Sequence, residues 1–294
     1  MGSLAPRVEF PPGWPSGGRR AGVLGSPIAH SLSPTLYRAG FAAAGLDDWS
    51  FEAVECDAAR LPALVNSLDA DWAGLAVTMP GKAAAASVAT TRSARVMALG
   101  VANTLLRRES GWYAENTDVD GVVGALTAAG VAPAGGVLLL GGGGTALAVV
   151  AALAELRWDG PLILAGRRPE STVTAVSLAD HLGLRARAVG FGADEIGAVA
   201  GGVALAVSTV PAGAADLLAG VLAPVPALLD VVYHPWPTPL AGAGGPDRIT
   251  VTGLDMLLHQ ALRQFHLVTG VSAPADAMRS ALRAAVGSGP PLPV

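Results

Sequence analysis

The hydrophobic positions of this chain fall into two kinds of segment that alternate along its length. Short apolar runs are followed by longer stretches in which the apolar residues recur at helical spacing. This alternation is typical of βαβ units and of a mainly parallel sheet. The pattern therefore predicts an α/β protein.

The first half of the chain contains one series of such segments. Its predicted strands are residues 21–24, 51–55, 74–77, 103–107 and 112–114, and its predicted helices are residues 34–44, 59–68 and 118–129. Residues 83–98 fit either a helix or a flexible connection.

A second series begins at Val137. Its predicted strands are residues 137–140, 162–165, 185–189, 203–208, 227–231 and 249–252, and its predicted helices are residues 145–156, 172–182, 254–269 and 275–286. This repetition is typical of a doubly wound nucleotide-binding domain.

A glycine cluster separates the first strand of the second series from the apolar helix that follows it. Its members are Gly141, Gly142, Gly143 and Gly144, followed by Thr145. In a dinucleotide fold, such glycines let the backbone approach a pyrophosphate at the N-terminus of the helix. A glycine-rich turn chosen only for close helix packing is the alternative. The strand before the cluster and the helix after it favour the dinucleotide site.

The end of the next predicted strand bears on the choice of cofactor. An NAD-preferring fold places Asp or Glu there to hold the ribose hydroxyl groups, whereas this chain has Arg167 and Arg168. Two guanidinium groups suit a 2'-phosphate, so NADP (NADPH) is the predicted cofactor. The alternative is that the two arginines belong to a solvated turn.

Composition narrows the kinds of partner. The net charge of -4 and the pI of about 5.7 give no general attraction to nucleic acid or to an anionic membrane. No apolar run reaches the length of a membrane span, and no secretory signal opens the sequence. The charge therefore favours a small molecule as the partner. The lone Cys56 leaves no intramolecular disulfide, and no cysteine and histidine cluster suggests a metal site, so both facts fit a cytoplasmic protein. The histidines, interpreted as structural, are His30, His181, His234, His259 and His266.

One basic side chain differs from all the others. Lys82 is the single lysine among 19 basic residues, and the other basic residues are arginines. Arginine keeps its proton at ordinary pH, whereas an amine can release and recover one, so Lys82 is a candidate acid/base group. The alternative is a surface lysine that escaped a general bias toward arginine.

Asp118 is the candidate partner of this lysine. At the start of a predicted helix its charge would complement the helix dipole, which is the common role of such residues. Near Lys82 it would also stabilise the ammonium group and accept a hydrogen bond from a substrate hydroxyl. Such a pair is what proton transfer during carbonyl reduction requires.

Two serines lie at the start of the first predicted helix. Ser33 precedes Pro34 and is expected to cap the helix, whereas Ser31 has no capping role. Two hydroxyl groups beside free N–H groups can bind a carboxylate, so a paired role is a second interpretation.

Together, several motifs resemble those of the shikimate dehydrogenase family, whose NADP-dependent members are shikimate 5-dehydrogenases. In order along the chain they are residues 31–34, 77–82, 102–105, 116–118, 141–145, 230–233 and 253–260. The resemblance extends from about residue 21 to residue 285. Two positions depart from the family pattern: Ala76 stands where asparagine is usual, and Gly166-Arg167-Arg168 stands where Asn-Arg-Thr is usual.

The resemblance implies a role for each matching position. The substrate carboxylate would be held by Ser31, Ser33 and Tyr233, and its ring hydroxyls by Thr78, Asn103, Asp118 and Gln260. Lys82 would be the acid/base catalyst with Asp118 as its partner. The dinucleotide would contact Gly141, Gly142, Gly143, Gly144, Thr145, Arg167, Arg168, Val231 and Gly253. Helical spacing also places Gly253, Met256 and Gln260 on one helix face, where Met256 could contact nicotinamide or pack in the core.

The length of 294 residues favours two domains. We expect a flexible leader (1–20), a substrate-binding and catalytic α/β domain (21–117 plus 257–286), a Rossmann-like NADP-binding domain (118–256) and a flexible tail (287–294). In this arrangement the C-terminal helices return to the substrate domain.

The reaction implied by the resemblance is the reversible NADPH-dependent reduction of 3-dehydroshikimate to shikimate, in the chorismate pathway of aromatic amino-acid biosynthesis. The alternatives are an NAD-dependent quinate/shikimate dehydrogenase, a catalytically silent NADP-binding regulatory relative and a folate-linked dehydrogenase. A homodimer is compatible with the sequence, which does not decide the oligomeric state.

Overall fold

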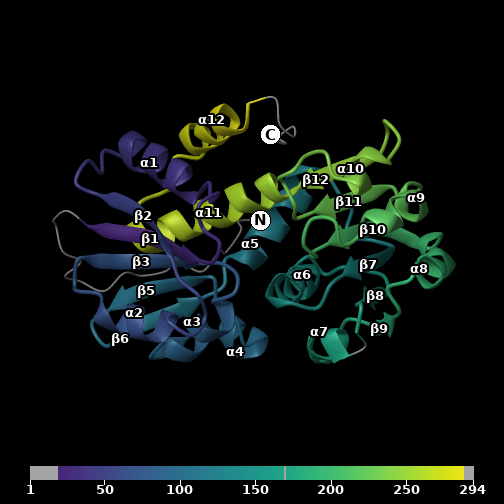
Figure 1. Ribbon diagram of the computed structural model, residues 1–294, viewed down its shortest axis with the longest axis horizontal. Coiled ribbons are helices and arrows are strands. Elements are labelled where there is room, and N and C mark those ends of the chain that lie inside the picture. Colours follow the sequence, from purple (N-terminus) through teal and green to yellow (C-terminus); the bar gives the residue numbers. More distant parts are fainter. Residues whose placement is uncertain (1–18, 169, 288–294) are drawn as a thin grey trace, which may run out of the picture.

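The computed structural model describes residues 19–168 and 170–287 of the chain (Figure 1). Two six-stranded sheets lie side by side, one in each half of the molecule, with helices packed around them. The predicted leader and tail lie almost wholly outside the described residues. The alternating apolar pattern therefore predicted the α/β class and the division into two sheets correctly.

The first sheet is mixed, with the strand order β2-β1-β3-β5-β6-β4. Its strands are β1 (Arg20–Gly25), β2 (Ser50–Glu55), β3 (Trp72–Val77), β4 (Thr91–Arg92), β5 (Thr104–Arg108) and β6 (Gly111–Glu115). β1 is parallel to β2 and β3, but β5 runs antiparallel to both β3 and β6. β5 and β6 are separated by two residues, a connection too short for a parallel crossover, so they form a hairpin.

The second sheet is parallel throughout, with the strand order β12-β11-β10-β7-β8-β9. Its strands are β7 (Gly136–Leu140), β8 (Leu162–Ala165), β9 (Ala186–Val189), β10 (Val203–Ser208), β11 (Ala227–Asp230) and β12 (Ile249–Thr252). This is the order of a doubly wound dinucleotide-binding fold. The first strand of the series, β7, lies between β8 and β10. The order therefore reverses at β7, and a ligand crevice is expected at the carboxyl ends of β7 and β10.

The side chains of β7 show why these strands are almost wholly apolar. Val137 and Leu139 belong to one buried cluster, and Leu138 and Leu140 belong to another on the opposite face of the sheet. Helices cover both faces, so neither set of alternate residues meets water.

The helices connect the strands and cover the sheets. They are α1 (Ser33–Ala43), α2 (Leu61–Ser67), α3 (Lys82–Val88), α4 (Ala94–Leu99), α5 (Asp118–Ala128), α6 (Gly144–Glu155), α7 (Glu170–His181), α8 (Ala193–Ala200), the 3-10 helix η1 (Asp216–Leu218), α9 (Ala219–Leu222), α10 (Pro239–Gly242), α11 (Gly253–Thr269) and α12 (Ala275–Val286). Residues 83–98, which fitted either of two interpretations, form most of α3 and α4 with β4 between them. The sequence pattern did not predict α8, α9 and α10, which have at most eight residues each. No helix in the described ranges has the length and hydropathy to cross a membrane.

The C-terminal helices return to the first sheet, as predicted (Figure 1). Phe265 of α11 and Met278 of α12 pack against Gly40 of α1, where an added Cβ would lie 2.7 Å from the Phe265 ring. α11 also packs on α5 at Gly121, where a Cβ would lie 2.7 Å from the backbone oxygen of Met256. α5 and α11 therefore connect the two halves and position the cleft between them.

Candidate active site

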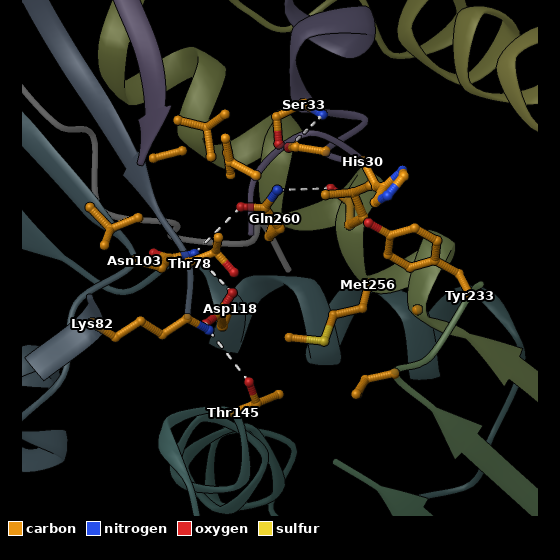
Figure 2. A pocket seen from close by; sticks show the side chains of 18 of the residues that line it. His30, Ser33, Thr78, Lys82, Asn103, Asp118, Thr145, Tyr233, Met256 and Gln260 are labelled. Carbon is orange, nitrogen blue, oxygen red and sulfur yellow. Dashed lines mark hydrogen bonds and ion pairs between the residues drawn. The ribbon is translucent and has the colours of Figure 1, made fainter. Parts of the chain in front are cut away.

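A polar cavity of about 320 Å³ lies between the two sheets (Figure 2). Every residue that the family resemblance assigned to substrate lines it: Ser31, Ser33, Thr78, Lys82, Asn103, Asp118, Tyr233 and Gln260. These residues come from both halves of the chain, and the fold brings them to one place. Ala76, at the position where asparagine is usual, contributes to the same wall.

Lys82 and Asp118 form an ion pair in this cavity. Lys82 Nζ lies 2.5 Å from Asp118 Oδ2 and 3.4 Å from Thr145 Oγ1 (Figure 2). The side chains are 16% and 9% exposed, so water screens the pair only weakly. Because Thr145 belongs to α6, the ammonium group contacts the helix that follows the glycine cluster.

Hydrogen bonds fix the position of the Asp118 carboxylate. Its Oδ1 accepts a hydrogen bond of 2.9 Å from Asn103 Nδ2, and its backbone N–H donates to Asn116 Oδ1 at 3.1 Å. The backbone N–H of Thr117 donates to Asn103 Oδ1 at 2.7 Å, which orients the amide of Asn103. One carboxylate oxygen therefore faces Asn103 and the other faces Lys82.

The serine end of the cavity differs from the prediction in one respect. α1 begins at Ser33 and not after it, because Leu32 already has helical backbone angles and is the N-cap residue. Ser33 makes no side-chain cap, whereas Ser31 Oγ accepts from the backbone N–H of Ser33 at 3.4 Å. The prediction that Ser33 caps the helix was wrong. Ser33 is buried and its side chain lines the cavity.

An aromatic group and an imidazole complete this end of the cavity. The Tyr233 hydroxyl is a neutral donor near pH 7, and burial raises its pKa further above the ordinary value of about 10. His30 also lines the cavity, although the sequence pattern had indicated only a structural role, and its ring stacks on that of His234 at a centroid distance of 6.4 Å. His30 follows the first strand and His234 follows β11, so the pair joins the two halves at the cavity.

One face of α11 forms part of the wall, as helical spacing predicted. Gly253, Met256 and Gln260 all line the polar cavity. Met256 is 7% exposed and also belongs to the buried cluster of the second sheet. Met256 therefore packs in the core, as one interpretation held, and also presents its side chain to the cavity, while its contact with nicotinamide stays a prediction (Figure 2).

A second cavity, of about 580 Å³, lies along the glycine cluster and is called the glycine-loop cavity below. Of the residues assigned to the dinucleotide, it is lined by Gly141, Gly142, Gly143, Gly144, Thr145, Arg167, Arg168 and Val231. Gly253 and Met256 line the polar cavity instead. The sequence analysis missed Ser171, Phe191 and Thr209, which contribute to the glycine-loop cavity through folding of distant segments.

The two cavities adjoin one another. Both are lined by Thr78, Lys82, Thr145 and Val231. The ion pair of Lys82 and Asp118 therefore lies where a molecule in the polar cavity would meet one in the glycine-loop cavity.

The glycine loop has the geometry that a dinucleotide requires. Gly141 has a φ of +112°, and a Cβ there would lie 2.5 Å from Thr209 Oγ1. Gly142 packs against the backbone oxygen of Ser171 and leaves no space for a Cβ, whereas nothing lies within 4 Å of a Cβ at Gly143. The loop is thus close-packed on one side and open on the other, at the N-terminus of α6. Together with the exposed Arg167 and Arg168, these residues fit a phosphorylated dinucleotide.

Among the described residues, no group of three or more His, Cys, Asp or Glu side chains could hold a metal ion. The polar groups of the site are hydroxyls, amides, the His30 imidazole, one ammonium and one carboxylate, which suit a hydroxylated organic anion.

Comparisons with known proteins agree with this geometry. Residues 23–105 match the family model of the shikimate dehydrogenase substrate binding domain, and residues 253–283 match that of the shikimate 5'-dehydrogenase C-terminal domain. The chain is 37% identical to a shikimate dehydrogenase (NADP(+)) of Acidiphilium cryptum, over 88% of this chain and 93% of that protein.

Solved structures show the same relationship. The crystal structure of Mycobacterium tuberculosis shikimate dehydrogenase is 46% identical, with a TM-score of 0.84 over 90% of this chain and 99% of that one. The Thermus thermophilus shikimate 5-dehydrogenase, solved in complex with NADP(H) and shikimate, is 30% identical, with a TM-score of 0.79 over 91% of this chain and 99% of that one. This chain therefore belongs to the shikimate dehydrogenase family.

Proposed function

We propose that this protein catalyses the reversible NADPH-dependent reduction of 3-dehydroshikimate to shikimate, a step of aromatic amino-acid biosynthesis. The observation that carries the proposal is the position of the Lys82 and Asp118 ion pair at the junction of the two cavities. One cavity fits a small hydroxylated anion and the other fits a dinucleotide. The names of the relatives, shikimate dehydrogenase (NADP(+)), support the same substrate and cofactor.

The polar cavity has groups for each part of such a substrate. Ser31, Ser33 and Tyr233 lie at one end and bind the carboxylate through their hydroxyl groups. The side chains that bind the ring hydroxyls line the rest of the cavity, and they are Thr78, Asn103, Asp118 and Gln260. Several short hydrogen bonds from fixed groups hold the ring in one orientation.

Lys82 supplies the proton of the reaction. In the reducing direction its ammonium group donates a proton to the carbonyl oxygen as this oxygen becomes a hydroxyl, and the amine recovers a proton from water. Asp118 holds the ammonium group in place and accepts a hydrogen bond from a substrate hydroxyl. Bound NADPH supplies the hydride.

The glycine-loop cavity binds the cofactor. Residues 141–145 receive the pyrophosphate at the N-terminus of α6, and Arg167 and Arg168 bind the 2'-phosphate. Val231, Gly253 and Met256 line the polar cavity near the junction and contact the nicotinamide end.

The proposal also covers the domain boundaries, the cellular location and the oligomeric state of the enzyme. We infer a substrate domain of residues 21–117 plus 257–286 and an NADP-binding domain of residues 118–256, with α5 and α11 passing between them. The enzyme is cytoplasmic, as its single cysteine and its relation to biosynthetic enzymes suggest. Light scattering after size-exclusion chromatography measures the mass that decides whether the enzyme is a homodimer.

A spectrophotometric assay at 340 nm tests the activity. Shikimate and quinate are each offered with NADP+ and with NAD+, and the initial rates are compared. We expect shikimate with NADP+ to give the highest kcat/KM. A preference for quinate with NAD+ would instead indicate a quinate/shikimate dehydrogenase, and binding of NADP+ without turnover of either substrate would indicate a regulatory relative.

A further inference from the structure

A chain of buried polar side chains lies behind the polar cavity. It runs from Tyr37 of α1 through Gln264 of α11 and Thr104 of β5 to Asn103. These residues are 1%, 1%, 0% and 3% exposed, respectively. Gln264 lines neither cavity, and the roles proposed above use neither Gln264 nor Tyr37.

A backbone carbonyl fixes which groups donate and which accept in the first hydrogen bonds of this chain of side chains. The backbone oxygen of Asn103 can only accept a hydrogen bond, so the group of Gln264 that lies 3.2 Å from it must be the amide nitrogen Nε2. Gln264 Oε1 therefore faces Tyr37, whose hydroxyl donates to it at 3.0 Å. Nε2 also donates to Thr104 Oγ1 at 2.6 Å.

The same order of donor and acceptor continues from Thr104 through Asn103 to the Asp118 carboxylate of the ion pair. Since Thr104 Oγ1 accepts from Gln264, its own proton has two acceptors within reach, Asn103 Oδ1 at 2.8 Å and Thr117 Oγ1 at 3.3 Å, and the contact to Asn103 is the shorter. Asn103 Oδ1 also accepts from the backbone N–H of Thr117 at 2.7 Å. With its oxygen held on that side by both donors, Asn103 turns its Nδ2 toward Asp118 Oδ1 at 2.9 Å. Every donor in the chain thus points from Tyr37 toward the Asp118 carboxylate, whose other oxygen faces Lys82.

We propose that Gln264 is a positioning residue for the Lys82 and Asp118 pair. It acts through the Thr104 hydroxyl, which together with the backbone N–H of Thr117 holds Asn103 in the orientation that places a donor on Asp118 Oδ1. The carboxylate then keeps its Oδ2 directed at Lys82 Nζ through the reaction. This inference rests on the function proposed above, because it assigns the pair to proton transfer.

The competing explanation is purely structural. Gln264 would then stabilise the fold by satisfying buried polar atoms and would have no effect on the ion pair. Two substitutions of similar size separate the explanations. Gln264→Met removes the donor to Thr104, whereas Tyr37→Phe removes only the hydroxyl behind Gln264 and leaves the amide oriented by the backbone of Asn103.

The kinetic test compares both variants with the wild type. We expect Gln264→Met to lower kcat about five- to tenfold and to change the pH dependence of kcat, since loss of one buried hydrogen bond loosens the pair. Tyr37→Phe should lower the midpoint of thermal unfolding but keep kcat within about twofold of the wild type. A wild-type kcat in folded Gln264→Met, or equal losses of kcat in both variants, would overturn the proposal.

A second pair of variants covers the case in which Gln264→Met does not fold. Thr104→Val removes the hydroxyl that connects Gln264 to Asn103 and keeps the shape of the side chain, whereas Thr104→Ser keeps the hydroxyl. The valine variant should lose kcat as Gln264→Met does, and the serine variant should recover most of it. Failure of the serine variant to exceed the valine variant would count against the hydrogen-bond chain.

A spectroscopic measurement separates this inference from the proposed activity. Because Lys82 is the single lysine, protein labelled with 13C at the lysine ε-carbon gives one lysine signal in NMR. We expect Gln264→Met to move or broaden this signal and Tyr37→Phe to leave it unchanged. Absence of wild-type turnover would refute the proposed activity alone, whereas an unchanged signal in Gln264→Met would refute the coupling of Gln264 to the pair.

Discussion

Lys82 and Asp118 are each the first residue of a helix, and their charged groups lie 2.5 Å apart. Asp118 is in a favourable place, since the N-terminus of α5 carries partial positive charge. Lys82 is not, because it is the first residue of α3 and a positive charge is unfavourable at the N-terminus of a helix. The carboxylate therefore offsets an unfavourable position of the lysine and fixes the ammonium group at the junction of the two cavities.

The first prediction concerns the proton that Lys82 supplies. Lys82→Ala should lower kcat by about 10²- to 10⁴-fold, the usual contribution of a general acid or base. Lys82→Arg should recover little, because a guanidinium group keeps the charge but does not release its proton. Ser87→Ala, at an exposed position of the same helix, is the control and should keep the wild-type kcat. Near-normal turnover by Lys82→Arg in the 340 nm assay would eliminate the acid/base role.

A second prediction separates Asp118 from its neighbour Asp120. Asp118→Asn removes the charge next to Lys82 and should lower kcat by about 10²-fold or more. Asp120 lies one half-turn further along α5, outside both cavities, and pairs with Arg95 at 2.6 Å. Asp120→Asn should lower the midpoint of thermal unfolding without a comparable loss of kcat. Equal kinetic losses in both variants would show that the effect does not depend on the contact of Asp118 with Lys82.

The choice of cofactor gives a third prediction. Replacing both Arg167 and Arg168 by alanine should raise KM for NADP+ about tenfold or more and change KM for NAD+ little, because charge-assisted bonds to the 2'-phosphate are lost. Arg187→Ala removes an exposed arginine from β9, outside the glycine-loop cavity, and serves as the control. A parallel rise of KM for both cofactors would contradict a 2'-phosphate site at these arginines.

The open side of the glycine loop gives a fourth prediction. A Cβ at Gly143 meets nothing within 4 Å, so Gly143→Ala should leave the midpoint of thermal unfolding unchanged. The added methyl group should instead raise the Kd for NADP+, because it obstructs the approach of the pyrophosphate to the loop. Gly142→Ala should instead destabilise the protein, because its Cβ meets the backbone oxygen of Ser171. Wild-type affinity for NADP+ in Gly143→Ala, measured by calorimetry, would place the pyrophosphate elsewhere.

A fifth prediction follows from Asp255, the buried carboxyl group at the start of α11. Burial raises its pKa to about 6, although Thr252 donates two hydrogen bonds to it. In the unfolded chain its pKa is about 4, so the folded protein keeps the proton at pH values where the unfolded chain has lost it. The contribution of this group to stability is therefore fully present below pH 4 and is lost as the pH rises to about 6 and above.

The matching measurement compares the wild type with Asp255→Asn, which keeps an acceptor for Thr252 and does not ionise. The free energy of unfolding of the wild type should fall relative to that of the variant by at most about 3 kcal/mol between pH 4 and pH 7. Asp194→Asn, at an exposed position in the first turn of α8, is the control for removal of a carboxylate that is not buried. A constant difference between wild type and Asp255→Asn across this range would refute the raised pKa.

Local pattern in the sequence determined much of the architecture. The apolar run from Val137 to Leu140 predicted a strand, and the glycines after it predicted the loop at the start of α6. Spacing along α11 placed Gly253, Met256 and Gln260 on one face. These properties follow from the periods of helices and strands, which are visible in a single stretch of chain.

Other features of the fold depended on packing and not on a local period. Ser33 looked like a helix cap, but the helical backbone of Leu32 placed it inside the first turn, where it lines the cavity. The prediction of a mainly parallel sheet likewise did not identify β5 as the strand that pairs antiparallel with β3.

The site itself was decided by tertiary structure. Lys82 and Asp118 are 36 residues apart, and Tyr37 and Gln264 are 227 residues apart, yet each pair forms a hydrogen bond. The sequence identified Lys82 by its residue type and Asp118 by its place at the start of a predicted helix, and the family resemblance implied the same roles, but neither revealed the chain of donors through Gln264. Hydrogen bonds between distant segments form only where packed helices and strands bring donor and acceptor within about 3 Å, and that placement is a property of the whole fold.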